Sequence, residues 1–325
     1  MISKTLLLSL CCVFLQANIA TSQDLTLNFA QNGLKSTKNM FEKNLKSVSF
    51  WNDFLKDKFV DYGYYEKPKT LLLSSKDSKI LYLVEVSPTE INLIKTFDTI
   101  IGGLGNKVKE GDLKTPVGVY EINKKFIPKD GFYGPLAYET SYPNLYDRLG
   151  LKTGYGIWIH GYPLDGSKRD PMSKGCIVLK NSELTDLAKN IKNIDNLKLI
   201  IYEKGMPRVD KNDIELILAN LYSWKYAWEE NNLEEYLDYY HKDFLKSDKK
   251  NLKEFKKYKK RIFDKKENKT IKISDINILP YPNLKNHKMF RITFLEDYKS
   301  ESYKFYGMKE LYVKIDDTMK IIVEK

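Results

Sequence analysis

Seven short apolar runs between residues 70 and 202 constrain the fold of this chain more than any other feature. Runs of this length, rich in β-branched and aromatic residues and bounded by Gly, Pro, Asp and Asn, predict strands. One helical pattern accompanies them at 183–191, with Ser182 as its expected N-cap. We therefore predict a mainly-β domain over 67–205, with strands at 70–73, 80–86, 91–101, 117–122, 156–160, 176–179 and 197–202.

Helical patterns lie on both sides of this domain. Apolar residues three and four apart over 35–60 predict an amphipathic helix, so 23–66 is interpreted as a helical packing or dimerisation segment. Gly205 and Pro207 mark the second boundary. Beyond them we predict an α+β domain over 206–325, with helices at 214–228 and 233–240 and strands at 270–278, 289–295, 309–315 and 319–323. The 325 residues are thus expected to form a multidomain protein.

The N-terminus and the charge balance bear on location and partners. Residues 1–22 combine Lys4, an apolar run and small residues, which is the layout of a signal peptide; cleavage after Ser22 is expected, with lipid attachment as the weaker option. No later stretch is apolar over the length of a membrane span. The net charge of +11 favours anionic partners, and export makes nucleic acid the least expected of them. The lysine-rich stretch 249–266 has a helical apolar face and is interpreted as a solvated basic helix.

Cys176 is the one cysteine outside the predicted signal peptide, which contains Cys11 and Cys12. A lone thiol in an oxidising compartment is either a nucleophile, a buried inert group or an intermolecular disulfide partner. A nucleophilic thiol needs an adjacent base or cationic imidazole, and His160 is the only histidine of the β domain. His241 and His287 fall in a predicted helix and a predicted loop, where surface or packing roles are expected.

Gly175 precedes the thiol, so successive backbone N–H groups can turn toward one point and stabilise an oxyanion. This favours acyl transfer. The sequence shows no metal-ligand cluster, and Gly102-Gly103-Leu104-Gly105 lacks the Lys-Ser or Lys-Thr that would close a phosphate loop. We therefore expect neither metal nor cofactor.

Three ordered blocks carry a family resemblance: Lys114-Thr115-Pro116-Val117-Gly118-Val119-Tyr120, Ile159-His160-Gly161 and Ser173-Lys174-Gly175-Cys176-Ile177. They resemble the signature blocks of the L,D-transpeptidase catalytic (YkuD) domain family over about residues 67–204. The resemblance implies that Cys176 is the acylated nucleophile, His160 its base and acid, and the Gly161 carbonyl the group that orients the imidazole. It also implies oxyanion N–H groups at Gly175 and Cys176, and a surrounding shell of Lys114, Tyr155, Trp158 and Ser173.

Two positions depart from the family pattern. Most members carry His or Arg where this chain has Lys174, and Arg where it has Val178. The residue that binds a substrate carboxylate therefore cannot be carried over directly. Four cations could take that role: Arg148, Lys168, Arg169 and Lys174.

The flanking segments make the chain similar to the cell-shape L,D-carboxypeptidases of helical Gram-negative bacteria, whose last domain resembles nuclear transport factor 2 (NTF2). That similarity implies a periplasmic hydrolase that removes D-alanine from peptidoglycan tetrapeptide stems, and a homodimer is a further expectation. A transpeptidase using the same acyl-enzyme is the first alternative, and a non-catalytic wall-binding protein is the second. A catalytic Cys176 is expected to alkylate fast at mildly acidic pH and slowly in His160→Ala.

Overall fold

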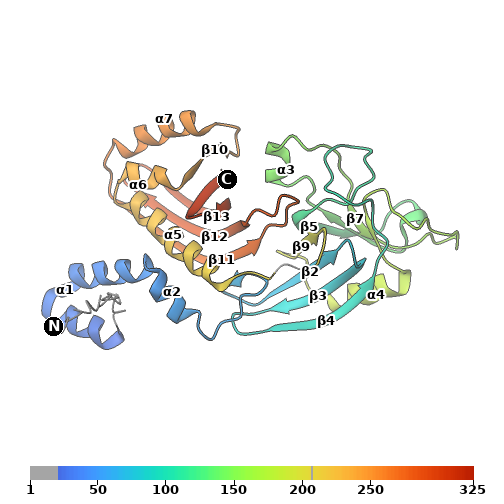
Figure 1. The fold of residues 1–325 in the computed structure, drawn as a ribbon, viewed down its shortest axis with the longest axis horizontal. Helices are drawn as coiled ribbons and strands as arrows, with labels where there is room; N and C mark the ends of the chain where they lie inside the picture. Colours follow the sequence, from blue (N-terminus) through green and yellow to red (C-terminus); the bar gives the residue numbers. More distant parts are fainter. Residues whose placement is uncertain (1–20, 206–207) are drawn as a thin grey trace, which may run out of the picture.

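Two β-sheets organise the computed structural model, which describes residues 21–205 and 208–325 (Figure 1). One sheet is built mainly from the middle of the chain and the other from its C-terminal third. Helices α5, α6 and α7 pack with the C-terminal sheet, and α1 and α2 extend the molecule at its N-terminal end (Figure 1). The predicted multidomain fold, with a mainly-β domain, an α+β domain and an N-terminal helical segment, is confirmed.

The first sheet has eight strands in the order β4-β3-β2-β9-β5-β6-β7-β8. Their bounds are β2 Lys69–Ser75, β3 Ile80–Val86, β4 Ile91–Asp98, β5 Gly118–Phe126, β6 Ala137–Thr140, β7 Trp158–His160, β8 Ile177–Val178 and β9 Lys198–Tyr202. The seven predicted strands are all present in shorter or longer form. Strand β6 was not predicted; it pairs with both β5 and β7 and so connects the centre of the sheet to the β7–β8 edge.

Two short helices and a 3-10 turn accompany this sheet: α3 Leu145–Leu149, α4 Asn181–Asn190 and η1 Gly131–Tyr133. The predicted N-cap of α4 is wrong, because Lys180 occupies that position and makes no side-chain cap bond. Ser182 lies one residue inside the helix, and the side chain of Asn181 accepts a hydrogen bond from the N–H of Tyr162.

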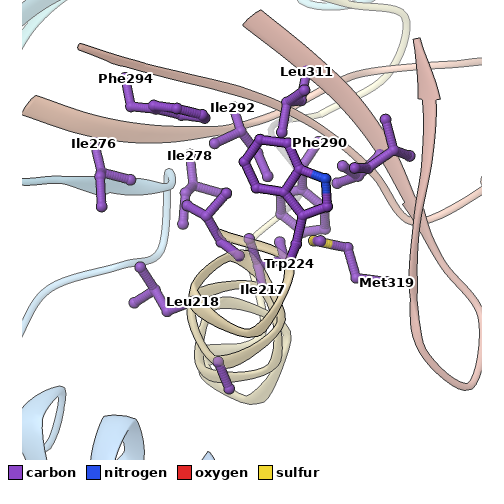
Figure 2. Packing of buried hydrophobic residues seen from close by; sticks show 14 of the residues in the cluster. Ile217, Leu218, Trp224, Ile276, Ile278, Phe290, Ile292, Phe294, Leu311 and Met319 are labelled. Carbon is purple, nitrogen blue, oxygen red and sulfur yellow. The ribbon is translucent and has the colours of Figure 1, made fainter. Parts of the chain in front are cut away.

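The second sheet has six strands in the order β1-β11-β12-β13-β14-β10. Their bounds are β1 Tyr64–Tyr65, β10 Tyr240–Lys246, β11 Lys269–Pro280, β12 Met289–Ser300, β13 Lys304–Ile315 and β14 Met319–Glu324. Helix α5 (Lys211–Glu229) packs its apolar face on this sheet, and Figure 2 shows Trp224 of α5 among Phe290, Ile292 and Leu311. Helices α6 (Leu233–Asp238) and α7 (Leu252–Phe263) complete the domain.

His241 lies in a strand, which corrects its predicted helical position. Helix α6 ends at Asp238, and β10 then pairs in parallel with β14. The first residue of β10, Tyr240, is buried, and its hydroxyl donates to a Glu324 carboxylate oxygen of β14 at 2.6 Å. This bond holds β10 beside β14. His287 lies in the loop between β11 and β12, as predicted.

The N-terminal segment forms two helices, α1 Ser22–Leu45 and α2 Val48–Phe54, instead of one. Gly33 interrupts α1 with φ 74°, and Thr21 begins it with a capping box. Helix α2 packs on α5, where the Trp51 and Tyr222 rings stack at 5.5 Å. The signal-peptide prediction falls almost entirely on residues 1–20, outside the described residues. Dimerisation through this segment stays a prediction.

The two sheets share a buried apolar interface. Leu71, Val119 and Ile200 of the first sheet pack in one cluster with residues of the second sheet, among them Leu279, Tyr312 and Val323. Arg291 of β12 crosses the same interface, with Nη2 2.7 Å from a Glu121 carboxylate oxygen. The central strands of the first sheet form this interface. The β7–β8 edge of that sheet lies outside it. Within the described part of the chain, no helix is long and apolar enough to cross a membrane.

Candidate active site

Strands β7 and β8 bring the predicted thiol and imidazole to one face of the sheet. The strands are parallel, with Ile159 beside Ile177 and His160 beside Val178. This register places Trp158 beside Cys176. Because residues two apart on a strand face the same side, the side chains of Trp158, His160 and Cys176 share a face. The structure thus brings the two predicted residues to one face of the sheet, and their joint role in catalysis stays a prediction.

His160 is fully buried and held in one orientation. Its Nδ1 lies 2.8 Å from the Gly161 carbonyl oxygen, which can only accept, so Nδ1 carries the proton and Nε2 is the unprotonated, basic nitrogen. The Tyr133 ring packs edge-on against the imidazole at 5.0 Å between centroids. The pKa of His160 is lowered to about 4: burial is the largest cause, the hydrogen bond to Gly161 opposes it, and the charge of Arg169 adds to it.

Cys176 is half-buried and contacts the backbone of the strand beside it. Its Sγ lies 3.5 Å from the Gly156 carbonyl oxygen, to which it donates, and the Trp158 N–H donates to Sγ at 3.5 Å. Burial raises the pKa of the thiol above its usual value, although the Trp158 N–H and Arg169 oppose the shift. Both shifts favour the neutral thiol and the neutral imidazole at neutral pH. This differs from the expected fast alkylation at mildly acidic pH, because burial disfavours both charged forms.

Position 161 requires glycine because the Asn181 side chain lies too close to its backbone for a Cβ atom. A Cβ at this position would lie 2.2 Å from Oδ1 of Asn181, the residue that opens α4. The Gly161 N–H donates to the Tyr133 carbonyl at 2.9 Å, and Asn181 Oδ1 accepts from the Tyr162 N–H at 2.8 Å. These contacts fix the Gly161 carbonyl, which in turn fixes the tautomer of His160.

The turn before Cys176 is closed by Ser173. Its hydroxyl donates to the Cys176 carbonyl at 2.6 Å and accepts from the Gly175 N–H at 3.1 Å. Gly175 adopts φ +124°, which L side chains rarely adopt. The Gly175 N–H predicted for the oxyanion is thus already bonded, and an oxyanion would have to share it.

Aromatic and cationic groups form one wall of the site. The Trp158 ring packs edge-on against Phe126 at 5.0 Å and Tyr133 at 5.1 Å. The Arg169 guanidinium lies 4.2 Å from the Phe132 ring centroid and places Nη2 3.4 Å from Nε2 of His160. Two buried donors on this wall, Arg169 Nη1 and Trp158 Nε1, have no hydrogen-bond partner in the described structure.

The remaining predicted residues lie in different places. Tyr155, Lys168 and Lys174 are exposed on the loops around Cys176. The Lys114 side chain runs beside Gly103 and Gly105. Arg148 lies on α3, donates to the Pro143 carbonyl and lines a cavity of about 590 Å³ between the two sheets, a cavity that Cys176 and His160 do not line. The structure thus brings Arg169 to the imidazole, and it places Arg148 elsewhere.

Sequence reasoning missed several residues around the site. Tyr133, Phe132 and Asn181 carry no motif that could single them out. Lys107 is buried, with Nζ 2.8 Å from the Asp112 carboxylate, and Lys76 is buried in a similar way. Lysines in a chain this basic look like solvated surface charges, so no local signal marks them. In residues 21–205 and 208–325, no three His, Cys, Asp or Glu side chains are grouped to hold a metal ion.

Comparisons with known proteins agree with this architecture. The model of the L,D-transpeptidase catalytic domain (YkuD) matches residues 69–209, and that of the Cds6 C-terminal NTF2-like domain matches 216–325. A solved structure of Pgp2, the helical cell shape determining protein of Campylobacter jejuni, is 44% identical, covers 86% of this chain and 99% of its own, and superimposes with a TM-score of 0.81.

Two more relatives extend the comparison. Bd1075 of Bdellovibrio bacteriovorus is 27% identical over 83% of this chain and 96% of its own, with a TM-score of 0.65. YafK of Escherichia coli (strain K12), a candidate L,D-transpeptidase by name, is 33% identical over 86 residues, which are 26% of this chain and 31% of that protein's length. The chain therefore belongs to the L,D-transpeptidase catalytic (YkuD) domain family, in the group of Pgp2, where an NTF2-like domain follows the catalytic domain.

Proposed function

We propose that this protein is a peptidoglycan L,D-carboxypeptidase that removes the terminal D-alanine from tetrapeptide stems. The observation that carries the proposal is the shared face of β7 and β8, on which the register places the side chains of Cys176 and His160; Nε2 of His160 is unprotonated and lies 3.4 Å from Nη2 of Arg169. Similarity to the cell shape determining protein Pgp2 supports a peptidoglycan substrate.

The first half of the reaction forms an acyl-enzyme. His160 Nε2 takes the proton of the Cys176 thiol as Sγ attacks the carbonyl carbon at the L-centre of diaminopimelate. The Cys176 N–H is the donor that we assign to the resulting oxyanion, with Gly175 sharing its N–H from Ser173. Collapse of the tetrahedral intermediate breaks the peptide bond, and the imidazolium gives its proton to the leaving amine of D-alanine.

Water completes the reaction. The neutral imidazole takes a proton from water, the hydroxide attacks the thioester carbon, and the thiolate leaves with the proton from His160. The products are a tripeptide stem and a free Cys176. A second stem's amine in place of water would give a transpeptidase, which is the alternative outcome of the same acyl-enzyme.

Arg169 is the residue that we assign to the substrate's terminal carboxylate. Its Nη1 is buried without a partner, and its Nη2 lies at the imidazole where the bond is broken. A guanidinium binds a carboxylate in a fork of two parallel hydrogen bonds. The terminal carboxylate belongs to the D-alanine that follows the attacked carbonyl. If Arg169 must bind this carboxylate, the enzyme can release only the last residue of a stem, which favours carboxypeptidase activity.

An Arg169→Gln variant tests this assignment with two substrates, a disaccharide-tetrapeptide and the same compound with a C-terminal amide. We expect kcat/KM for the free acid to fall by about 100-fold, as the loss of a charge-assisted hydrogen-bond pair costs about 2–3 kcal/mol. The slow reaction of the amide should change little. Lys168→Gln, an exposed neighbour, is the matched control. Equal losses on both substrates would contradict the assignment.

We also propose that the protein is exported and acts in the periplasm, where it would shape the cell wall. The apolar run and Lys4 near the N-terminus support export. Fractionation of cells that express the full chain, followed by mass determination of the purified protein, would test both the location and the cleavage after Ser22.

A further inference from the structure

Lys76 is a buried lysine that the proposed reaction does not use. It follows β2, and its side chain is completely enclosed. Its Nζ donates to the carbonyl oxygens of Gly105 at 2.5 Å and Thr115 at 2.9 Å, and lies 2.8 Å from Oε2 of Glu203. Two donors of the ammonium group thus bond to carbonyl oxygens, and the Glu203 carboxylate supplies the opposite charge. Burial of a charge is tolerated when it is paired and hydrogen-bonded in this way.

Glu203 holds the same loop from the other side. Its Oε1 accepts from the Gly105 N–H at 2.6 Å, so Lys76 and Glu203 together bind both backbone groups of Gly105. Thr115 links this loop to the next segment, because its hydroxyl accepts from the Gly102 N–H at 2.8 Å. The pair therefore fixes 102–105 against 113–115.

These two segments form the wall behind the nucleophile's turn. A Cβ on Gly102 would lie 2.9 Å from the Gly175 nitrogen, and a Cβ on Gly175 would lie 2.9 Å from the Lys114 carbonyl oxygen. The backbones are thus packed with no space between them. A shift of the wall would move Gly175, and with it the N–H of Cys176.

We propose that Lys76 and Glu203 are a positioning pair that sets the oxyanion-binding backbone at Gly175–Cys176, an inference that rests on the acyl transfer proposed above. Oxyanion donors act only when they are held at the position of the developing charge. The pair touches neither the thiol nor the imidazole in any contact of the described structure. Its loss should therefore slow reactions that pass through an oxyanion and spare those that do not.

Two reactions of Cys176 separate these cases. Acylation by p-nitrophenyl acetate passes through a tetrahedral oxyanion: Sγ bonds to the acetyl carbon, His160 takes the thiol proton and p-nitrophenolate leaves. Alkylation by iodoacetamide displaces iodide at a saturated carbon and forms no oxyanion. In Lys76→Met we expect acylation to slow by about tenfold or more, as removal of an oxyanion donor costs about 100- to 1000-fold. Alkylation should stay within about twofold of the wild type.

Controls keep this test decisive. Lys198→Met removes a half-buried, ion-paired lysine of the same sheet, which bonds to Glu121 at the domain interface; both of its rates should be unchanged. If Lys76→Met does not fold, Thr115→Val breaks the next link while keeping the side-chain shape, and should show the same selective loss. Equal slowing of both reactions, or none, would overturn the inference. Because the ester is not the natural substrate, this result is independent of whether tetrapeptides are trimmed.

Discussion

The pKa shifts of the buried His160 and the half-buried Cys176 favour their neutral forms, whereas the C-terminal domain buries ion-paired side chains beside a cavity of about 730 Å³. There Lys309 Nζ lies 2.5 Å from Oε1 of Glu324, and the Tyr240 hydroxyl donates to its Oε2 at 2.6 Å. Lys259 is buried in the same cluster, 4.1 Å from the Trp228 ring centroid. Glu296 also lines this cavity, and its Oε2 has no hydrogen-bond partner in the described structure.

The pKa shifts in the C-terminal cluster reflect both burial and the neighbouring charges. Burial lowers the pKa of Lys259 to about 8 and raises that of Glu296. Burial also opposes ionisation of Glu324, but Lys309 and Lys259 outweigh it and hold the pKa of Glu324 below its usual value. A buried charge is tolerated here because it has partners. In the candidate active site, burial shifts the pKa values of Cys176 and His160 toward the neutral forms, so no charge has to be desolvated there and a neutral imidazole could accept a proton.

The largest expected effect comes from removing the base. His160→Asn keeps a polar side chain but has no basic nitrogen, so we expect kcat for tetrapeptide trimming to fall by about 1000-fold. The measurement is D-alanine release under saturating substrate. His241→Asn, in the C-terminal domain, should retain full activity. A His160→Asn variant with more than a tenth of wild-type activity would show that the neutral pair is not the catalytic unit.

The second prediction concerns the charged cluster of the C-terminal domain. Lys309→Met leaves Glu324 and Glu296 buried with one less cation, and we expect the free energy of unfolding of the C-terminal domain to fall by about 3 kcal/mol. Urea unfolding followed by Trp fluorescence would measure it. Lys314→Met on the same strand, where the partner Asp316 is exposed, should cost less than about 0.5 kcal/mol. Similar costs for the two variants would contradict the contrast drawn between the domains.

The smallest effect is a difference in pH dependence. Because the pKa of Cys176 is raised, its thiolate fraction is small at neutral pH, and the rate of alkylation by iodoacetamide should rise continuously through pH 9. His160 is neutral above about pH 4, so it adds no second step between pH 5 and 8. A plateau of fast alkylation below pH 7 would show a thiolate–imidazolium pair and contradict the neutral resting state.

Local patterns were enough to predict which residues the two strands of the candidate active site carry, but not the residues that hold them in place. His160, Gly161 and Cys176 lie in short blocks whose order is visible in the sequence, and the strands around them follow apolar runs. The Lys76–Glu203 pair joins residues far apart in the chain, and nothing local distinguishes either residue from a surface charge. The pairing of Tyr64 with Ile278 in the C-terminal sheet is equally non-local. His241 was misplaced because the helical pattern of α6 continues past its end into β10.

The measurement that tests the central claim most directly is to incubate the protein and its Cys176→Ser variant with disaccharide-tetrapeptide and with peptidoglycan sacculi, and to determine product masses by mass spectrometry. We predict that the wild type converts tetrapeptide stems to tripeptides with the loss of one alanine, and that the variant does not. New crosslinks between diaminopimelate residues in place of tripeptide stems, or identical products from wild type and variant, would contradict a cysteine-dependent L,D-carboxypeptidase.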